Sequence, residues 1–247
     1  GQKGRGGHRC GGQAGRTDTN GRPPTGAGNK AARTDGAIPV SGNDHTAKVI
    51  GIMGATGCGK SYFLRKMLAR PARKRTLIWS PKEAIDGYAA LYPGSKICTT
   101  ANQVLALLKA AKAGPVHIVF RPMLERKKDA ALFGAVCKMA MAARNICVVA
   151  EEVHTVTQPS WAPDGWSELI MMGRGYGVEV FALSQRPASI DKDFFSNMSM
   201  LHVGRMNFDD DVKTCARALR VPVVDVQNLS GYQWIERDIL SGKTTRG

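Results

Sequence analysis

The segment GATGCGKS, residues 54–61, combines residue types that can hold a phosphate chain. Its glycines allow a backbone path in which successive N–H groups point at phosphate oxygens. Lys60 would contact the β and γ phosphates, and the hydroxyl of Ser61 would bind Mg²⁺. No guanine-reading NKxD motif is present, so the expected cofactors are ATP and Mg²⁺. The predicted ATP-binding residues are Gly54, Ala55, Thr56, Gly57, Cys58, Gly59, Lys60 and Ser61.

A second group of reactive side chains follows the apolar run ICVVA, where Glu151 and Glu152 stand side by side. We expect Glu151 to hold the hydration shell of Mg²⁺ and Glu152 to orient or deprotonate the attacking water. Such a pair favours an ATPase over a nucleoside kinase, which transfers phosphate to a bound substrate. The alternative interpretation is a solvated acidic turn.

Two further side chains flank the apolar run VEVFALS, residues 178–184. Gln185 follows it and would face the γ phosphate, where it could position water or sense the phosphate. Arg174 precedes it in the glycine-flanked loop GRGYG, at the opposite end of the expected strand. From there it would reach a neighbouring subunit's nucleotide rather than its own, as an arginine finger in trans. The alternative is an ordinary solvated arginine.

The elements that must position these residues alternate between strand-like and helix-like patterns, which is typical of a parallel sheet covered by crossover helices. The predicted fold class is therefore α/β, with six or seven strands and with YQWIERDIL as an edge strand. The expected strands cover residues 48–54, 76–81, 116–122, 145–152, 178–185 and 200–206. The expected helices cover residues 60–69, 101–113, 129–143, 167–172 and 209–219.

Composition divides the chain into two parts. Residues 1–46 are rich in Gly, Arg, Thr and Asn, with hardly an aliphatic side chain, and we expect a disordered basic arm. Residues 47–247 form the expected ATPase domain. The formal net charge of +15 predicts a polyanionic partner, chiefly nucleic acid.

The chain of 247 residues also carries signals about its compartment. No apolar run is long enough to span a membrane, so we expect a soluble protein without a transmembrane segment. The six cysteines show no metal-binding spacing and no secretion signal precedes them, which predicts reduced thiols in a cytoplasm.

Taken together, GATGCGKS, the strand ending in EE, the RGYG loop and the strand ending in SQRP resemble the FtsK and HerA superfamily of P-loop ATPases. The stretch SQRPASIDKDFFSNMSMLHVGRM is most similar to the genome-packaging ATPases of tailless icosahedral phages with internal membranes. The resemblance covers residues 48 to about 210. One departure is Glu151, where the family often has Asp; Glu remains an oxygen ligand for the metal.

The resemblance implies a RecA-like sheet, a hexameric ring and double-stranded DNA through its pore. It implies ATP hydrolysis by Lys60, Glu152, Gln185 and Arg174, with Ser61 and Glu151 at the metal. The expected role is packaging of a viral genome into a preformed capsid, in the host cytoplasm or at the packaging vertex, with a capsid or membrane protein as a possible partner.

Three alternatives remain open at this stage: a filamentous-phage-type assembly ATPase, a nucleotide-dependent switch or scaffold, and a nucleoside kinase. A motor that moves any genome should contact backbone phosphates rather than base edges. Candidate residues for that contact lie in ARPARKR (residues 69–75), in ERKK (residues 125–128) and at Arg186, Lys192 and Arg205. Trp79, Trp161, Trp166 and Trp234 are assigned to the core or to an interface.

Overall fold

The computed structural model describes residues 47–69, 71–81, 87–123 and 125–247; the arm predicted for residues 1–46 lies outside them. The strands are β1 (Val49–Met53), β2 (Arg75–Trp79), β3 (Lys96–Cys98), β4 (Val116–Phe120), β5 (Cys147–Ala150), β6 (Glu179–Ser184), β7 (Met200–Gly204), β8 (Trp234–Asp238) and β9 (Thr244–Arg246). Within the described residues these nine strands form one sheet, in the order β3-β4-β2-β5-β6-β1-β7-β8-β9. The pairs β7–β8 and β8–β9 are antiparallel and the others are parallel, so the predicted α/β class is confirmed.

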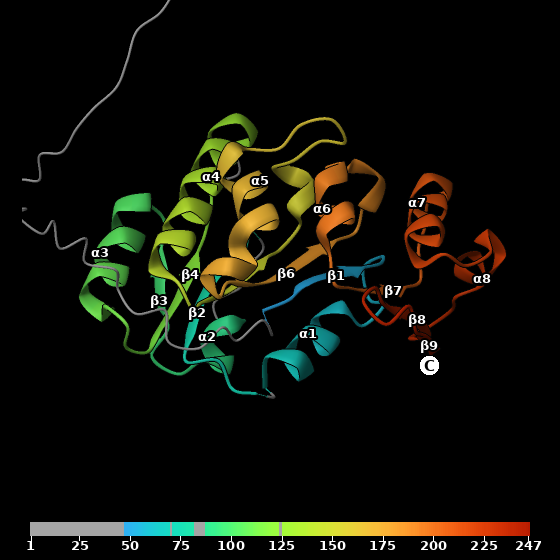
Figure 1. Cartoon of the computed structure of the whole chain (residues 1–247), viewed down its shortest axis with the longest axis horizontal. Helices are drawn as coiled ribbons and strands as arrows, with labels where there is room; N and C mark the ends of the chain where they lie inside the picture. The colour runs from blue at the N-terminus through green and yellow to red at the C-terminus, as the bar shows by residue number, and fades with distance from the viewer. Residues whose placement is uncertain (1–46, 70, 82–86, 124) are drawn as a thin grey trace, which may run out of the picture. The chain divides into compact units, whose positions relative to one another are not determined.

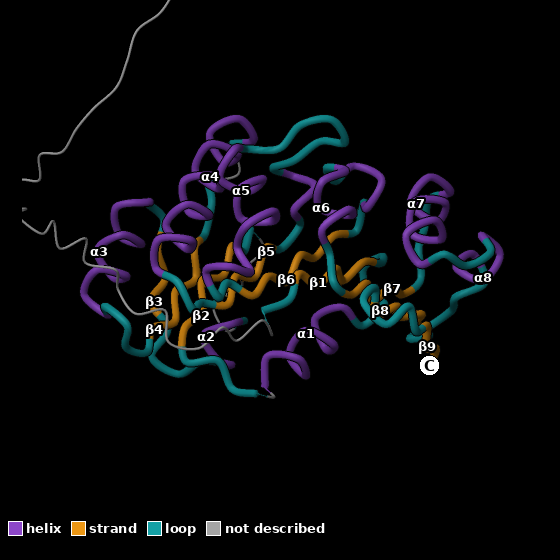
Figure 2. Tube along the Cα trace, viewed as in Figure 1, coloured by secondary structure: helices purple, strands orange, loops and turns teal. Residues whose placement is uncertain are grey.

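The helices are α1 (Lys60–Ala69), α2 (Tyr88–Leu91), α3 (Ala101–Ala111), α4 (Arg126–Ala143), α5 (Asp164–Met172), α6 (Lys192–Asn197), α7 (Asp209–Leu219) and α8 (Val223–Gln227). Figure 1 shows α3 to α6 above the sheet and α1 and α2 below it, and Figure 2 shows the strands as one layer between them. Two apolar cores fill the spaces between these layers. Leu64 and Leu68 of α1 belong to the lower core, and Phe133 of α4 and Trp166 of α5 belong to the upper one.

The central strands are apolar along their whole length because helices cover both of their faces. All five residues of β1 (VIGIM) and all four of β5 (CVVA) are buried. Continuous apolar runs of this kind are characteristic of parallel strands inside an α/β sheet. The sheet therefore holds the ends of β1, β5 and β6 rigidly beside one another.

The predicted number of strands was too low, and the position predicted for YQWIERDIL was wrong. The segment contains β8, but β9 pairs along its outer side, so β8 is not the edge. The strands β3 and β9 have only three residues each, which is too short for an alternating pattern to appear in the sequence. They form because the neighbouring strand offers backbone groups that need partners.

Five cysteines lie in the part of the chain that the structure describes, and each is a free, buried thiol: Cys58, Cys98, Cys137, Cys147 and Cys215. Burial raises the pKa of the Cys137 and Cys215 thiols, so both stay protonated. Reduced thiols at these five positions stay a prediction. In the described residues, no helix is both long enough and apolar enough to cross a membrane.

The contact between α4 and α5 depends on Gly165, and this gives a test of the fold. A Cβ atom at Gly165 would lie 2.0 Å from the carbonyl oxygen of Gly134, a backbone atom that cannot rotate away. We expect Gly165→Ala to lower the free energy of unfolding by about 2 kcal/mol or more. Gly175→Ala is the matched control, because nothing lies within 4 Å of its added methyl group. Equal unfolding midpoints in urea for the two variants would contradict this packing.

Candidate active site

Three neighbouring strands end at one edge of the sheet, and each is followed by residues that the sequence singled out. The strand β6 pairs with β5 on one side and with β1 on the other. The glycine-rich loop follows β1, the two glutamates follow β5, and Gln185 follows β6 between them. Ligands of open parallel sheets bind at this edge. The three groups line one cleft of about 340 Å³, in which the loop contributes Thr56, Gly57, Lys60 and Ser61. The other lining residues are Arg65, Ser80, Gly87, Tyr88 and Leu183.

The glycine-rich loop is held in a conformation that ordinary side chains would prevent. A Cβ atom at Gly54 would lie 2.4 Å from the sulfur of Cys58, and Gly57 has a φ of +77°. The loop is tied to both neighbouring strand ends: the N–H of Gly54 donates to the carbonyl of Ser184 at 3.1 Å, and that of Ala55 donates to the carbonyl of Arg205 at 2.7 Å. Cys58 itself is buried in the loop.

The loop continues directly into α1, which begins at Lys60. The side chain of Lys60 folds back over the loop, and its Nζ donates to the carbonyls of Gly54 at 2.7 Å and of Ala55 at 3.0 Å. The next residue, Ser61, is exposed, and no acidic residue lies in the first turn of α1. The cleft therefore faces a helix N-terminus with positive partial charge and a lysine, which together attract a phosphate chain.

The first glutamate is held by two hydroxyl groups that the sequence analysis did not identify. Ser80 Oγ donates to Glu151 Oε2 at 2.8 Å, and Tyr88 OH donates to Glu151 Oε1 at 2.6 Å. Ser80 follows β2 and Tyr88 begins α2, so these partners come from distant parts of the chain. Their hydrogen bonds fix the direction in which the Glu151 carboxylate faces the cleft.

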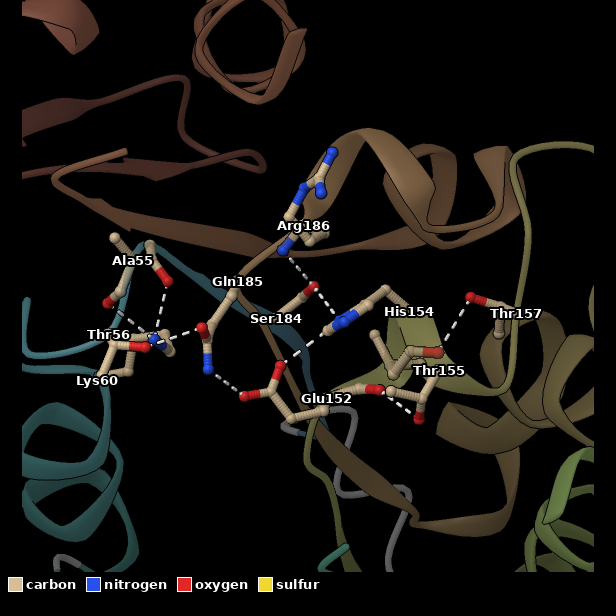
Figure 3. Close-up of polar contacts among 12 residues, drawn as sticks. Ala55, Thr56, Lys60, Glu152, His154, Thr155, Thr157, Ser184, Gln185 and Arg186 are labelled. Carbon is tan, nitrogen blue, oxygen red and sulfur yellow. Dashed lines mark hydrogen bonds and ion pairs between the residues drawn. The ribbon is translucent and has the colours of Figure 1, made fainter. Parts of the chain in front are cut away.

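The second glutamate joins a chain of hydrogen bonds that crosses the cleft, as Figure 3 shows. Gln185 Nε2 donates to Glu152 Oε1 at 2.5 Å, and Thr56 Oγ1 donates to Gln185 Oε1 at 2.8 Å. Glu152 is only 6% exposed and its φ is +49°, in the left-handed region. The loop after β1 is thus connected through Gln185 to the carboxylate after β5.

A histidine also lies beside Glu152, in the short 3₁₀ helix η1 (Val153–Thr155). His154 Nδ1 is 2.9 Å from Ser184 Oγ and 3.4 Å from Glu152 Oε2. The sequence analysis gave His154 no role. Only its place two residues after the predicted acidic pair could have suggested one.

Arg174 is not brought to this cleft. It lies exposed in the 3₁₀ helix η2 (Gly173–Tyr176), directly before β6, whereas Gln185 directly follows β6. The arginine and the cleft therefore lie at opposite ends of β6, as the sequence predicted. Two exposed apolar side chains precede it, Met171 at 53% and Met172 at 48% exposure.

A second cleft, of about 780 Å³, lies on the other side of the glycine-rich loop, between α1 and the strands β7 and β8. Aromatic side chains dominate its walls: Tyr62, Phe63, Tyr232 and Trp234. The residues Tyr62 and Tyr232 are 76% and 78% exposed. Tyr232 Cδ1 lies 3.6 Å from the point where Gly59 would carry a Cβ atom, so this cleft adjoins the loop.

The residues of the first cleft suit Mg²⁺ bound together with a nucleotide. Among the described residues, no cluster of three or more His, Cys, Asp or Glu side chains could hold a metal by itself. Mg²⁺ needs no such cluster, because it keeps several waters and binds through one or two protein oxygens and the substrate phosphates. Ser61 and Glu151, which line the same cleft, offer those oxygens.

The predicted phosphate-contacting surface is wrong for two of its arginines. Arg73 forms an ion pair with Glu179 at 2.9 Å. Arg75 is only 6% exposed, and its guanidinium donates to the carbonyls of Lys112 and Gly114, each at 2.7 Å. Both side chains therefore stabilise the fold and are not available to DNA. The reason is that ARPARKR leads into β2, a buried strand between β4 and β5. Arg186 is also engaged, by Asp211 at 2.9 Å.

Two of the four tryptophans lie in the core, as predicted, and an interface for the other two stays a prediction. Trp79 and Trp166 are buried in the upper core. Trp161 is 50% exposed, and Trp234 is half-buried in the wall of the second cleft.

Comparisons with known proteins support the fold described above. The genome-packaging NTPase B204 of Sulfolobus turreted icosahedral virus 2, in complex with AMPPCP, matches with a TM-score of 0.63 at 11% identity, covering 81% of this chain and 96% of that one. The DNA-packaging ATPase B204 of Sulfolobus turreted icosahedral virus matches with a TM-score of 0.61 at 14% identity and the same coverage. VirB4 of Thermoanaerobacter pseudethanolicus has a TM-score of 0.52 at 11% identity, over 80% of this chain and 88% of its own.

A relative is also found by sequence. Protein P9 of Pseudoalteromonas phage PM2 is 24% identical over 197 residues, which cover 80% of this chain and 83% of P9. No family model matches the chain. The chain thus has the fold of P-loop NTPases, and the predicted likeness to viral genome-packaging NTPases is confirmed at the level of fold.

Proposed function

We propose that the protein is an ATP-hydrolysing motor that moves double-stranded DNA into a preformed viral capsid. The observation that carries this proposal is the meeting of the glycine-rich loop, the two glutamates and Gln185 at the ends of three adjacent strands. The similar structures named as genome-packaging NTPases, one of them bound to an ATP analogue, support the same function. The superfamily proposed is that of FtsK and HerA.

The side chains of the loop would bind the nucleotide. Lys60 would exchange the carbonyls of Gly54 and Ala55 for the β and γ phosphates, while the amides at the start of α1 receive the phosphate oxygens. Ser61 and Glu151 would hold Mg²⁺, which when bound neutralises charge on the β and γ phosphates. Ser80 and Tyr88 keep Glu151 in the direction this role needs.

Glu152 would accept the proton of the attacking water. In that step the water oxygen bonds to the γ phosphorus, the bond from that phosphorus to the bridging oxygen breaks, and the proton passes to the carboxylate. Gln185 would hold the same water or sense the γ phosphate, because its amide lies between Glu152 and Thr56 of the loop. Burial of Glu152 limits its contact with bulk water.

The base of the nucleotide would bind in the aromatic cleft beside Gly59. We expect Tyr232→Ala to raise the KM for ATP about 10-fold, because base stacking on an aromatic ring is worth about 1–3 kcal/mol. kcat should change little, since the ring is remote from the γ phosphate. Tyr232→Phe is the matched control and should keep the KM of the parent, as it retains the ring. Steady-state kinetics measure both, and an unchanged KM in Tyr232→Ala would contradict this base site.

The proposed cargo is DNA contacted through its phosphates. The net charge of +15 favours a polyanion. Exposed cations such as Lys192 remain candidates for the contact, whereas Arg73 and Arg75 do not. The working form would be a ring of identical subunits, a hexamer, in which Arg174 reaches the neighbouring nucleotide. Such a motor would act in the host cytoplasm or at the packaging vertex, against a capsid or membrane protein.

Steady-state ATP hydrolysis with and without linear double-stranded DNA tests this function, at two salt concentrations and with Lys60→Ala as the inactive blank. We expect DNA to stimulate hydrolysis, and the stimulation to weaken at the higher salt because phosphate contacts are screened. A rate of ATP hydrolysis that is the same with and without DNA would contradict the motor. It would favour an assembly ATPase, as in filamentous phages, or a nucleotide-dependent switch. Activity remaining in Lys60→Ala would place the hydrolysis elsewhere.

A further inference from the structure

Two side chains approach the carboxylate of Glu152, one at each oxygen. Both are positioned by the end of β6, because Gln185 directly follows the strand and His154 contacts its last residue, Ser184. Gln185 Nε2 donates to Oε1 at 2.5 Å, and His154 Nδ1 lies 3.4 Å from Oε2. Figure 3 shows Gln185 and His154 on two sides of the carboxylate. A general base works only when its oxygen is aimed at the water, so contacts of this kind decide how well Glu152 performs.

The imidazole ring is anchored to the sheet through Ser184. His154 Nδ1 is 2.9 Å from Ser184 Oγ, and Ser184 Oγ accepts the backbone N–H of Arg186 at 2.9 Å. Ser184 is completely buried and is the last residue of β6. The orientation of the ring is therefore set by a rigid strand and not only by the short helix η1 that carries it.

The groups around the ring favour one position for its hydrogen. A carboxylate oxygen can only accept, so an Nδ1 without hydrogen would be repelled by Glu152 at 3.4 Å. The hydroxyl oxygen of Ser184 can accept as well. The arrangement is attractive when Nδ1 carries a hydrogen, which it donates to Ser184 Oγ at 2.9 Å while the ring edge faces Glu152 Oε2 at 3.4 Å.

The backbone at Glu152 adds a reason for such support. Its φ of +49° is unfavourable for a residue with a side chain, so the surrounding contacts must hold it. The N–H and the hydroxyl of Thr155 both bind the carbonyl of Glu152, each at 2.8 Å. The helix η1 thus holds the backbone of Glu152 while His154, on the same helix, faces its carboxylate.

We propose that His154 is a positioning residue for hydrolysis: its Nδ1–H, held by Ser184, keeps the Glu152 carboxylate turned toward Gln185 and the attacking water. This inference rests on the hydrolysis proposed above. It assigns His154 no contact with substrate. Its effect on the reaction passes through Glu152 alone.

Three variants of His154 separate a directed N–H from simple bulk. The side-chain amide nitrogen of Asn can occupy the place of Nδ1, whereas that of Gln reaches the place of Nε2. We expect His154→Ala and His154→Gln to lower kcat about 10- to 100-fold, with KM for ATP within about 3-fold of the parent, because a small displacement of a catalytic group has this effect. His154→Asn should keep most of kcat. His117→Asn, in β4 and bonded to Thr76 at 3.0 Å, is the control expected to keep kcat.

A combination with Glu152 shows whether His154 acts through that residue. In the Glu152→Gln background, His154→Ala should cause almost no further loss of kcat, because the group it positions is already absent. Unfolding midpoints and nucleotide affinity are measured for every variant. Equal kcat for His154→Ala and the parent, or full additivity with Glu152→Gln, would overturn the proposal.

Crystal structures of the parent, His154→Ala and His154→Asn supply a readout that needs no turnover. The hydrogen bond from Gln185 to Glu152 should persist in the parent and the Asn variant and be lost in the Ala variant. Its persistence in His154→Ala would overturn the positioning role even if no variant hydrolysed ATP. Absence of hydrolysis by the parent would instead contradict the proposed function, so the two failures are distinguishable.

Discussion

Glu152→Gln is expected to lower kcat for ATP hydrolysis about 10³-fold, which is within the range for loss of a general base. The amide has the same shape as the carboxylate but cannot accept the proton of the attacking water. Nucleotide binding should remain, because the loop, Lys60 and Glu151 are unchanged. Single-turnover hydrolysis measures the first effect, and titration with a fluorescent ATP analogue measures the second.

Glu168→Gln is the matched control for this prediction. Glu168 lies on α5 and forms a surface ion pair with Lys138 at 3.2 Å, away from the cleft. Its replacement should leave kcat unchanged. If Glu152→Gln retained more than about a tenth of the activity, its role as the base would be contradicted.

Arg174→Ala is expected to reduce kcat of the assembled protein about 10³-fold, the lower limit seen for arginine fingers. The affinity of the subunit's own cleft for ATP should stay the same, because Arg174 lies at the opposite edge of the sheet. Arg217→Ala is the matched control: Arg217 is exposed on α7, and its loss should leave kcat unchanged. Full activity in Arg174→Ala would show an ordinary solvated arginine.

Mixing two inactive proteins tests whether Arg174 acts on a neighbour. Lys60→Ala keeps its arginine but has lost its site, whereas Arg174→Ala keeps its site but has lost its arginine. If the arginine acts in trans, mixed rings contain intact sites and hydrolysis should recover when the two are combined. Failure to recover in rings proven to contain both variants would contradict action in trans.

The residues of the cleft were predictable where a local pattern carries the chemistry. The loop at residues 54–61 has a spacing that few other structures need, and Glu151, Glu152 and Gln185 each follow an apolar run long enough to be a buried strand. The parallel arrangement then placed all of these strand ends at one edge of the sheet.

What could not be predicted depends on the order of strands and on side chains brought from afar. The chain from Thr56 through Gln185 to Glu152 exists because β6 lies between β1 and β5, an order that sequence position does not specify. Ser80 and Tyr88 are distant in sequence from Glu151, and no motif connects them. The short strands β3 and β9 were not predicted, and Arg73 and Arg75 were assigned to the wrong surface, because in each case the surroundings are built from residues distant in sequence.

The central claim is that hydrolysis moves the protein along double-stranded DNA, and a triplex-displacement assay tests it most directly. A third strand is annealed to one end of a linear duplex, and its release is followed after protein and ATP are added at the other end. We predict release with ATP, and none with the non-hydrolysable analogue AMPPCP or with Lys60→Ala. ATP hydrolysis by assembled rings on this duplex without release of the third strand would contradict a translocating motor.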